Sequence, residues 1–141
     1  MKKLIVAAAL VLPVSAWATC TVTQPSTTTA KIVCTTANES APTLATDGMN
    51  VANCKRGVAP FVCAPGGTLS GTGTMKVYVW NSYASAWGEV PDLALSVNAS
   101  GTPVCMGFGS LMVYVRGPRI MLVPSSVGVS AGGVTTYLSC E

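Results

Sequence analysis

Few residues in this 141-residue chain could move protons, because it contains no histidine and only five carboxylates. Histidine is the usual general base at neutral pH, so its absence removes the commonest route to acid–base and nucleophilic catalysis. Glu89 and Asp92 come closest to the carboxylate pair that a glycosidase needs. They lie three residues apart beside Pro91, so both are expected on one solvated loop. A glycosidase would instead place one carboxylate on each side of the scissile bond. The sequence therefore predicts a protein that is not an enzyme.

The six cysteines indicate a disulfide framework, since an even number of cysteines is typical of exported chains. They are Cys20, Cys34, Cys54, Cys63, Cys105 and Cys140. A zinc site is disfavoured because the chain has no Cys-x-x-Cys pair and no histidine. We expect no metal, no cofactor and no free thiol nucleophile. Closeness along the chain favours the pairs Cys20–Cys34 and Cys54–Cys63, which leaves Cys105–Cys140.

Aromatic residues gather in the stretch 73–99, which reads as a strand, a long loop and a second strand. Its candidate ligand-binding residues are Tyr78, Trp80, Tyr83 and Trp87. Aromatic rings could stack on sugar rings, because they offer flat apolar area with a polar handle. The alternative is that Trp87 folds back over the core beneath the loop. We favour that structural role, because the loop lacks an obvious cluster of polar side chains for sugar hydroxyls.

Lys55 and Arg56 form a second candidate contact site, because they lie in a loop bounded by Cys54 and Cys63. Small protease inhibitors present a basic residue on such a constrained loop, which lowers the entropy cost of binding. An ordinary solvated turn is the favoured reading. The basic turn from Arg116 to Arg119 is interpreted in the same way.

Residues 1–18 have the features of a secretory signal peptide. Lys2 and Lys3 precede an apolar run, and Ala16-Trp17-Ala18 is an A-x-A cleavage site. The sequence predicts export to the periplasm, cell surface or exterior, with residues 19–141 forming one domain. Without the two leader lysines, six basic and five acidic residues remain, a net charge of +1. This balance disfavours nucleic acid as a partner, and we find no second apolar run long enough to span a membrane.

The pattern of apolar residues predicts antiparallel strands rather than helices. Met75, Val77 and Val79 alternate with Lys76, Tyr78 and Trp80, so the aliphatic set should face the core. Shorter strands are expected over 20–23, 30–35, 49–52, 93–99, 111–116, 120–123 and 133–140. Their spacing and the turn residues between them predict an all-β fold, either an antiparallel β-sandwich or a jelly roll, held by disulfides.

Together these features predict a secreted, non-enzymatic structural or interaction module, with a protein partner or self-association as the expected contact. The low charge of the chain limits repulsion between copies, and uncovered sheet edges invite strand pairing. A carbohydrate-binding module that uses the aromatic loop is the alternative function. A small disulfide-rich protease inhibitor is the second alternative.

Overall fold

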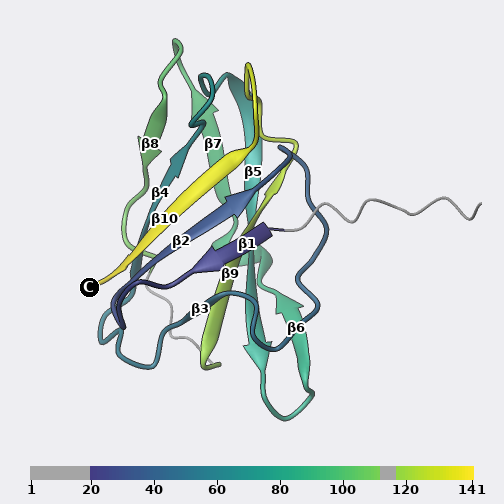
Figure 1. Cartoon of the computed structure of the whole chain (residues 1–141), viewed down its shortest axis with the longest axis vertical. Coiled ribbons are helices and arrows are strands. Elements are labelled where there is room, and N and C mark those ends of the chain that lie inside the picture. The colour runs from purple at the N-terminus through teal and green to yellow at the C-terminus, as the bar shows by residue number, and fades with distance from the viewer. Residues whose placement is uncertain (1–19, 112–116) are drawn as a thin grey trace, which may run out of the picture.

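The computed structural model describes residues 20–111 and 117–141, which form two antiparallel β-sheets (Figure 1). Sheet A has the strand order β1 (Cys20–Thr23), β2 (Thr29–Cys34), β10 (Val134–Cys140), β4 (Val58–Cys63) and β8 (Cys105–Gly107). Sheet B has the order β3 (Met49–Asn50), β9 (Arg119–Ser125), β5 (Gly71–Asn81) and β6 (Ala86–Glu89), and β7 (Leu95–Ala99) also pairs with β5. The predicted all-β fold is confirmed. The predicted leader and the expected strand 111–116 lie outside the described residues, apart from Leu111.

The core lies between the two sheets and is built from one face of each. Ile32 and Leu138 contribute from sheet A, while Met75, Val77 and Leu122 contribute from sheet B. Met75 and Val77 are fully buried, as the period-2 pattern predicts for β5. Full burial of a side chain of this size stabilises the fold by about 1.5–3 kcal/mol.

The prediction of a long loop after β5 is wrong in one respect, because part of this segment forms a strand. Residues Ala86–Glu89 form β6 and pair with the end of β5, with Trp87 opposite Trp80. The turn between the strands is stabilised by Asn81, whose Oδ1 accepts hydrogen bonds from the backbone N–H groups of Tyr83 and Ala84. A 3-10 turn, η1 (Pro91–Leu93), then leads to β7, which starts two residues later than predicted.

Three disulfides connect the cysteines, and one of the three predicted pairs is correct. Cys20–Cys34 and Cys63–Cys105 each join residues that lie directly opposite one another on neighbouring strands of sheet A. The third bond is Cys54–Cys140. The predicted pairs Cys54–Cys63 and Cys105–Cys140 are wrong.

The extended strand β4 explains this error. Residues 58–63 run straight, so Cys63 is carried roughly 17 Å from the start of the strand, beyond disulfide reach of Cys54. Strand β10 runs antiparallel to β4 and places Cys140 opposite Val58, at the end of β4 that Cys54 precedes. Antiparallel pairing therefore decides which cysteines meet.

The connection between β2 and β3 covers part of the outer face of sheet B. In Figure 1 it descends past β6 before it reaches β3. Trp87 Nε1 donates a hydrogen bond to the Leu44 carbonyl at 2.9 Å, and Arg119 Nη1 donates to the carbonyls of Thr46 and Gly48 at 3.2 and 3.0 Å. This cover explains why Met121, which shares the outer face with Tyr78, is buried.

Candidate functional site

Tyr78, the first predicted aromatic site residue, lies in the packed part of sheet B. Only 8% of its surface is exposed, and its hydroxyl donates to Glu89 Oε2 at 3.2 Å. The same carboxylate oxygen lies 3.3 Å from Lys76 Nζ. Burial, and then the negative charge of Glu89, raise the pKa of Tyr78 above its usual value. In this structure Tyr78 supports the hairpin and offers no ring face to a ligand.

The other three predicted aromatic residues are spread along the β5–β6 hairpin. Trp80 and Trp87 meet edge to face, with ring centroids 5.6 Å apart, and both are partly buried. Trp87 packs against the core cluster and bonds to Leu44, which agrees with the structural alternative for this residue. Tyr83 is fully exposed in the turn. The hairpin therefore presents one free ring rather than a flat aromatic platform.

Lys55 and Arg56 are exposed in a bend between Cys54 and β4. The Arg56 backbone N–H donates to the Glu141 carbonyl at 2.9 Å, and Cys54 is tied to Cys140. The bend is therefore fastened to the C-terminal end of β10, and the predicted Cys54–Cys63 loop does not form. An inhibitor loop would need an extended backbone with free N–H and C=O groups for the protease.

Three of the five carboxylates of the described residues serve local structure. Glu39 Oε1 accepts from the Thr36 backbone N–H at 2.8 Å, and Asp47 Oδ2 accepts from the N–H groups of Thr43 and Leu44. Glu89 is engaged by Lys76 and Tyr78, whereas Asp92 lies in the first turn of η1. Within residues 20–111 and 117–141, no group of three or more Cys, Asp or Glu side chains is placed to hold a metal ion.

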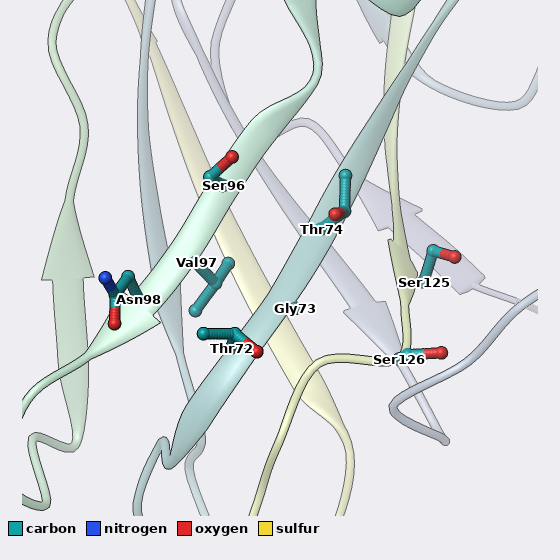
Figure 2. A pocket seen from close by; sticks show the side chains of 8 residues that line it. All are labelled: Thr72, Gly73, Thr74, Ser96, Val97, Asn98, Ser125 and Ser126. Atoms are coloured by element: carbon teal, nitrogen blue, oxygen red, sulfur yellow. The ribbon is translucent and has the colours of Figure 1, made fainter.

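A shallow polar hollow of about 560 Å³ lies over sheet B where β5, β7 and β9 run side by side (Figure 2). Hydroxyl and amide side chains from these strands and from the residue after β9 line it, namely those of Thr72, Thr74, Ser96, Asn98, Ser125 and Ser126. These groups can donate and accept hydrogen bonds, but they carry no charge and do not titrate near neutral pH. The hollow suits contact with a neutral polar surface and offers no acid–base chemistry.

A second groove, of about 370 Å³, lies on the outer face of sheet A, the sheet nearer the viewer in Figure 1. Lys31, Tyr137 and Phe61 stand directly opposite one another on β2, β10 and β4. Phe61 and Tyr137 are 48% and 43% exposed, and Lys31 Nζ lies 5.9 Å from the centre of the Tyr137 ring. We call this set the aromatic row.

The surroundings of the aromatic row make a hollow beside it. The neighbouring row of the sheet carries only small side chains, those of Thr29, Ser139 and Ala59. On the far side of Phe61 lies Gly107 of β8, where an added Cβ would lie 2.9 Å from the phenylalanine ring. The ring therefore lies close against the glycine backbone, an arrangement that shields a glycine in a sheet.

Sequence reasoning missed the aromatic row. The sequence predicts a disulfide-bounded loop around Phe61, whereas this residue belongs to β4. Tyr137 lies in a correctly predicted strand, and alternation with Val134, Thr136 and Leu138 already places it on the face away from the core. No local pattern shows that β10 lies between β2 and β4, which is what brings the three residues together.

Comparison with protein families, characterised proteins and solved structures finds no match for this chain. The site must therefore be interpreted from its own chemistry. Three disulfides are typical of proteins that work in an oxidising environment outside the cytoplasm. Among the described residues, no helix has the length and apolar character needed to cross a bilayer.

Proposed function

We propose that this chain is an exported, non-enzymatic interaction module that binds its partner through the outer face of sheet A. The observation that carries this proposal is the pair of exposed rings, Phe61 and Tyr137, in register on adjacent strands. Large exposed apolar side chains that lie together on a surface mark interaction sites, whereas scattered ones need no explanation. Aromatic residues are also the type most enriched at binding hot spots.

Three of the five described carboxylates support a role without catalysis. Glu39 and Asp47 hold backbone N–H groups, and Glu89 holds Lys76 and Tyr78. A general acid or base needs free access to a substrate proton, and these groups are committed to the fold. Turnover of an ester, peptide or glycoside that follows the protein through purification would overturn this part of the proposal.

The face of sheet A is a better contact surface than its edges. The edge strands β1 and β8 have four and three residues, and each is tied to its neighbour by a disulfide. Short edge strands are a common protection against pairing with another chain. We therefore place the expected contact on the aromatic row. Pairing of a partner's strand with β1 or β8 is expected to contribute little.

Photocrosslinking in the producing cell tests the location of the contact. A benzoylphenylalanine that replaces Phe61 should form covalent adducts with the partner when the cells are irradiated. The same group in place of Leu44, which is 62% exposed on the cover of sheet B, is the control. Adducts at position 61 and none at position 44 are expected. No adduct at position 61, or equal adducts at both positions, would contradict the proposed face.

A further inference from the structure

We propose that the groove beside the aromatic row binds a glycan that carries carboxylate groups. The inference rests on the proposed function, because it names the class of partner for the same face. Three features lead to it: a flat ring that is open to solvent, a lysine that forms no ion pair with a described carboxylate, and flanking hydroxyl groups. Each feature corresponds to a different part of an acidic sugar.

Phe61 provides the stacking surface. One side of its ring lies close against Gly107, and nearly half of the side chain remains exposed. A ring that is supported from below loses little freedom on binding, so less entropy opposes the contact. The electron-rich ring face attracts the weakly positive C–H groups of a sugar ring. The groove volume of about 370 Å³ is within the range of small-ligand sites, roughly 300–1,000 Å³.

Lys31 provides the charge. Among the described residues that line the groove it is the only charged one, and no carboxylate of the described residues lies within ion-pair distance of its Nζ. Its contact with the Tyr137 ring holds the side chain over the sheet without removing its charge. Lys31 therefore gives the groove one positive charge, which is complementary to a carboxylate on the ligand.

Hydroxyl groups complete the groove. The side chains of Thr29 and Ser139 lie opposite one another in the row beside Tyr137, and both line the groove. Thr29 Oγ1 already shares a hydrogen bond of 2.7 Å with Ser26 Oγ, and it keeps an acceptor position for a sugar hydroxyl. The Ser139 hydroxyl can both donate to a sugar hydroxyl and accept from one. Ala59 lies opposite Ser139 in the same row, and its small side chain leaves space beside Phe61. A sugar ring can occupy this space between Phe61 and the two hydroxyl groups.

A second copy of the chain fits this face less well. Contact between two identical faces about a two-fold axis would bring two copies of the aromatic row together, each with its own Lys31. None of the described residues that line the groove is acidic, so none of them offsets this repulsion. The charge on the face thus favours an anionic ligand over self-association.

Affinity electrophoresis of the purified protein tests the inference, with polygalacturonate as the acidic probe and its fully methyl-esterified form as the matched neutral probe. The apparent dissociation constant from the retardation should be at least about tenfold lower for the acidic probe than for the ester. This ratio corresponds to the free energy of one charge-assisted hydrogen bond. Phe61→Ser should abolish retardation by either probe. Lys31→Gln should weaken binding of the acidic probe about tenfold and leave binding of the ester unchanged. Leu44→Ser is the control variant and should behave as the wild type.

Several results would overturn the inference. Equal retardation by both probes would remove the role of the carboxylate, and unchanged binding by Phe61→Ser would remove the stacking surface. Loss of binding in Tyr83→Ser, with Phe61→Ser intact, would move the site to the β5–β6 turn. Far-UV circular dichroism shows that each variant is folded, and because the substituted side chains are exposed we expect native spectra.

The two proposals can fail separately. Crosslinking at position 61 without retardation by polygalacturonate would keep the binding face and reject the acidic glycan. Sedimentation equilibrium that shows a dimer, dissociated by Phe61→Ser, would identify a second copy as the occupant and likewise reject the glycan. Absence of crosslinking at position 61 would reject both.

Discussion

At the scale of single residues, the aromatic side chains of this chain differ according to what covers their face of the sheet. Tyr78 and Trp87 lie on the outer face of sheet B, where Tyr78 is buried and Trp87 is hydrogen-bonded to the β2–β3 connection. Phe61 and Tyr137 lie on the outer face of sheet A and remain open. The residues best suited to binding are therefore those outside the aromatic stretch 73–99.

The buried hydroxyl of Tyr78 leads to a pH prediction. Its pKa is raised in the folded state, so the unfolded chain loses this proton first as the pH rises above the usual value of 10.0. Deprotonation then favours unfolding, and the stability should fall with increasing pH from about pH 10 upward. Urea unfolding at alkaline pH should show a steeper fall for the wild type than for Tyr78→Phe.

The Tyr78→Phe variant also tests the hydrogen bond to Glu89. At neutral pH it should lower the free energy of unfolding by about 0.5–1.5 kcal/mol, the usual net value of one hydrogen bond. In a spectrophotometric titration of the folded protein, the variant should lose a component that ionises above the usual tyrosine value of 10.0. Loss of a component that ionises at or below that value would contradict the raised pKa of Tyr78.

Gly48 is a residue whose replacement should be costly. It has a φ of +84°, and an added Cβ would lie 2.5 Å from the Ile120 carbonyl oxygen and 2.7 Å from the Trp87 ring. Gly48→Ala should therefore destabilise through both backbone strain and a clash. Gly101→Ala is the matched control, because Gly101 has a φ of +81° with nothing within 4 Å.

The comparison of the two glycine variants separates strain from packing. Gly101→Ala should cost about 1–2 kcal/mol for the left-handed conformation alone. Gly48→Ala should cost more, and it should alter tryptophan fluorescence because Trp87 must shift. Chemical unfolding measures both values. Equal losses in the two variants would show that the close contacts with Ile120 and Trp87 add nothing to the backbone strain.

At the scale of elements, the local strand pattern could be predicted and the pairing between distant strands could not. The hairpin β1–β2 and the strands β5 and β10 follow from alternation and turn residues that lie within a few positions. The order β2-β10-β4 joins segments from the start, the end and the middle of the chain. Both the aromatic row and the Cys54–Cys140 bond depend on that order, which is why sequence reasoning missed them.

The disulfides give a prediction at this scale. The Cys54–Cys140 bond closes a loop with a sequence separation of 86, whereas Cys20–Cys34 closes one of 14. A longer closed loop restricts the unfolded chain more, so the longer bond should stabilise by about 1.5 kcal/mol more. The double variant Cys54→Ala/Cys140→Ala should therefore unfold at lower urea than Cys20→Ala/Cys34→Ala. The opposite order would show that the shorter bond contributes beyond chain entropy.

At the scale of the whole molecule, the disulfides are unevenly distributed between the sheets. Cys20–Cys34 and Cys63–Cys105 lie within sheet A, and Cys54–Cys140 joins the end of sheet A to the segment that follows β3 of sheet B. The proposed binding face is thus on the sheet that is more strongly cross-linked. A rigid face suits a site that gains affinity by keeping its rings in place before the ligand arrives.

The combined contribution of the three disulfides predicts that the folded state depends on their oxidation. Loop-closure entropy assigns the three bonds a combined contribution of roughly 11 kcal/mol, comparable with the whole net stability of a domain, about 5–15 kcal/mol. The fully reduced chain should therefore lack a cooperative thermal transition, whereas the oxidised chain should show one. Calorimetry of a reduced and alkylated sample beside an untreated sample measures this difference. A reduced chain that still unfolds cooperatively would show that the core between the sheets is sufficient, and the argument for an oxidising environment would then lose its energetic basis.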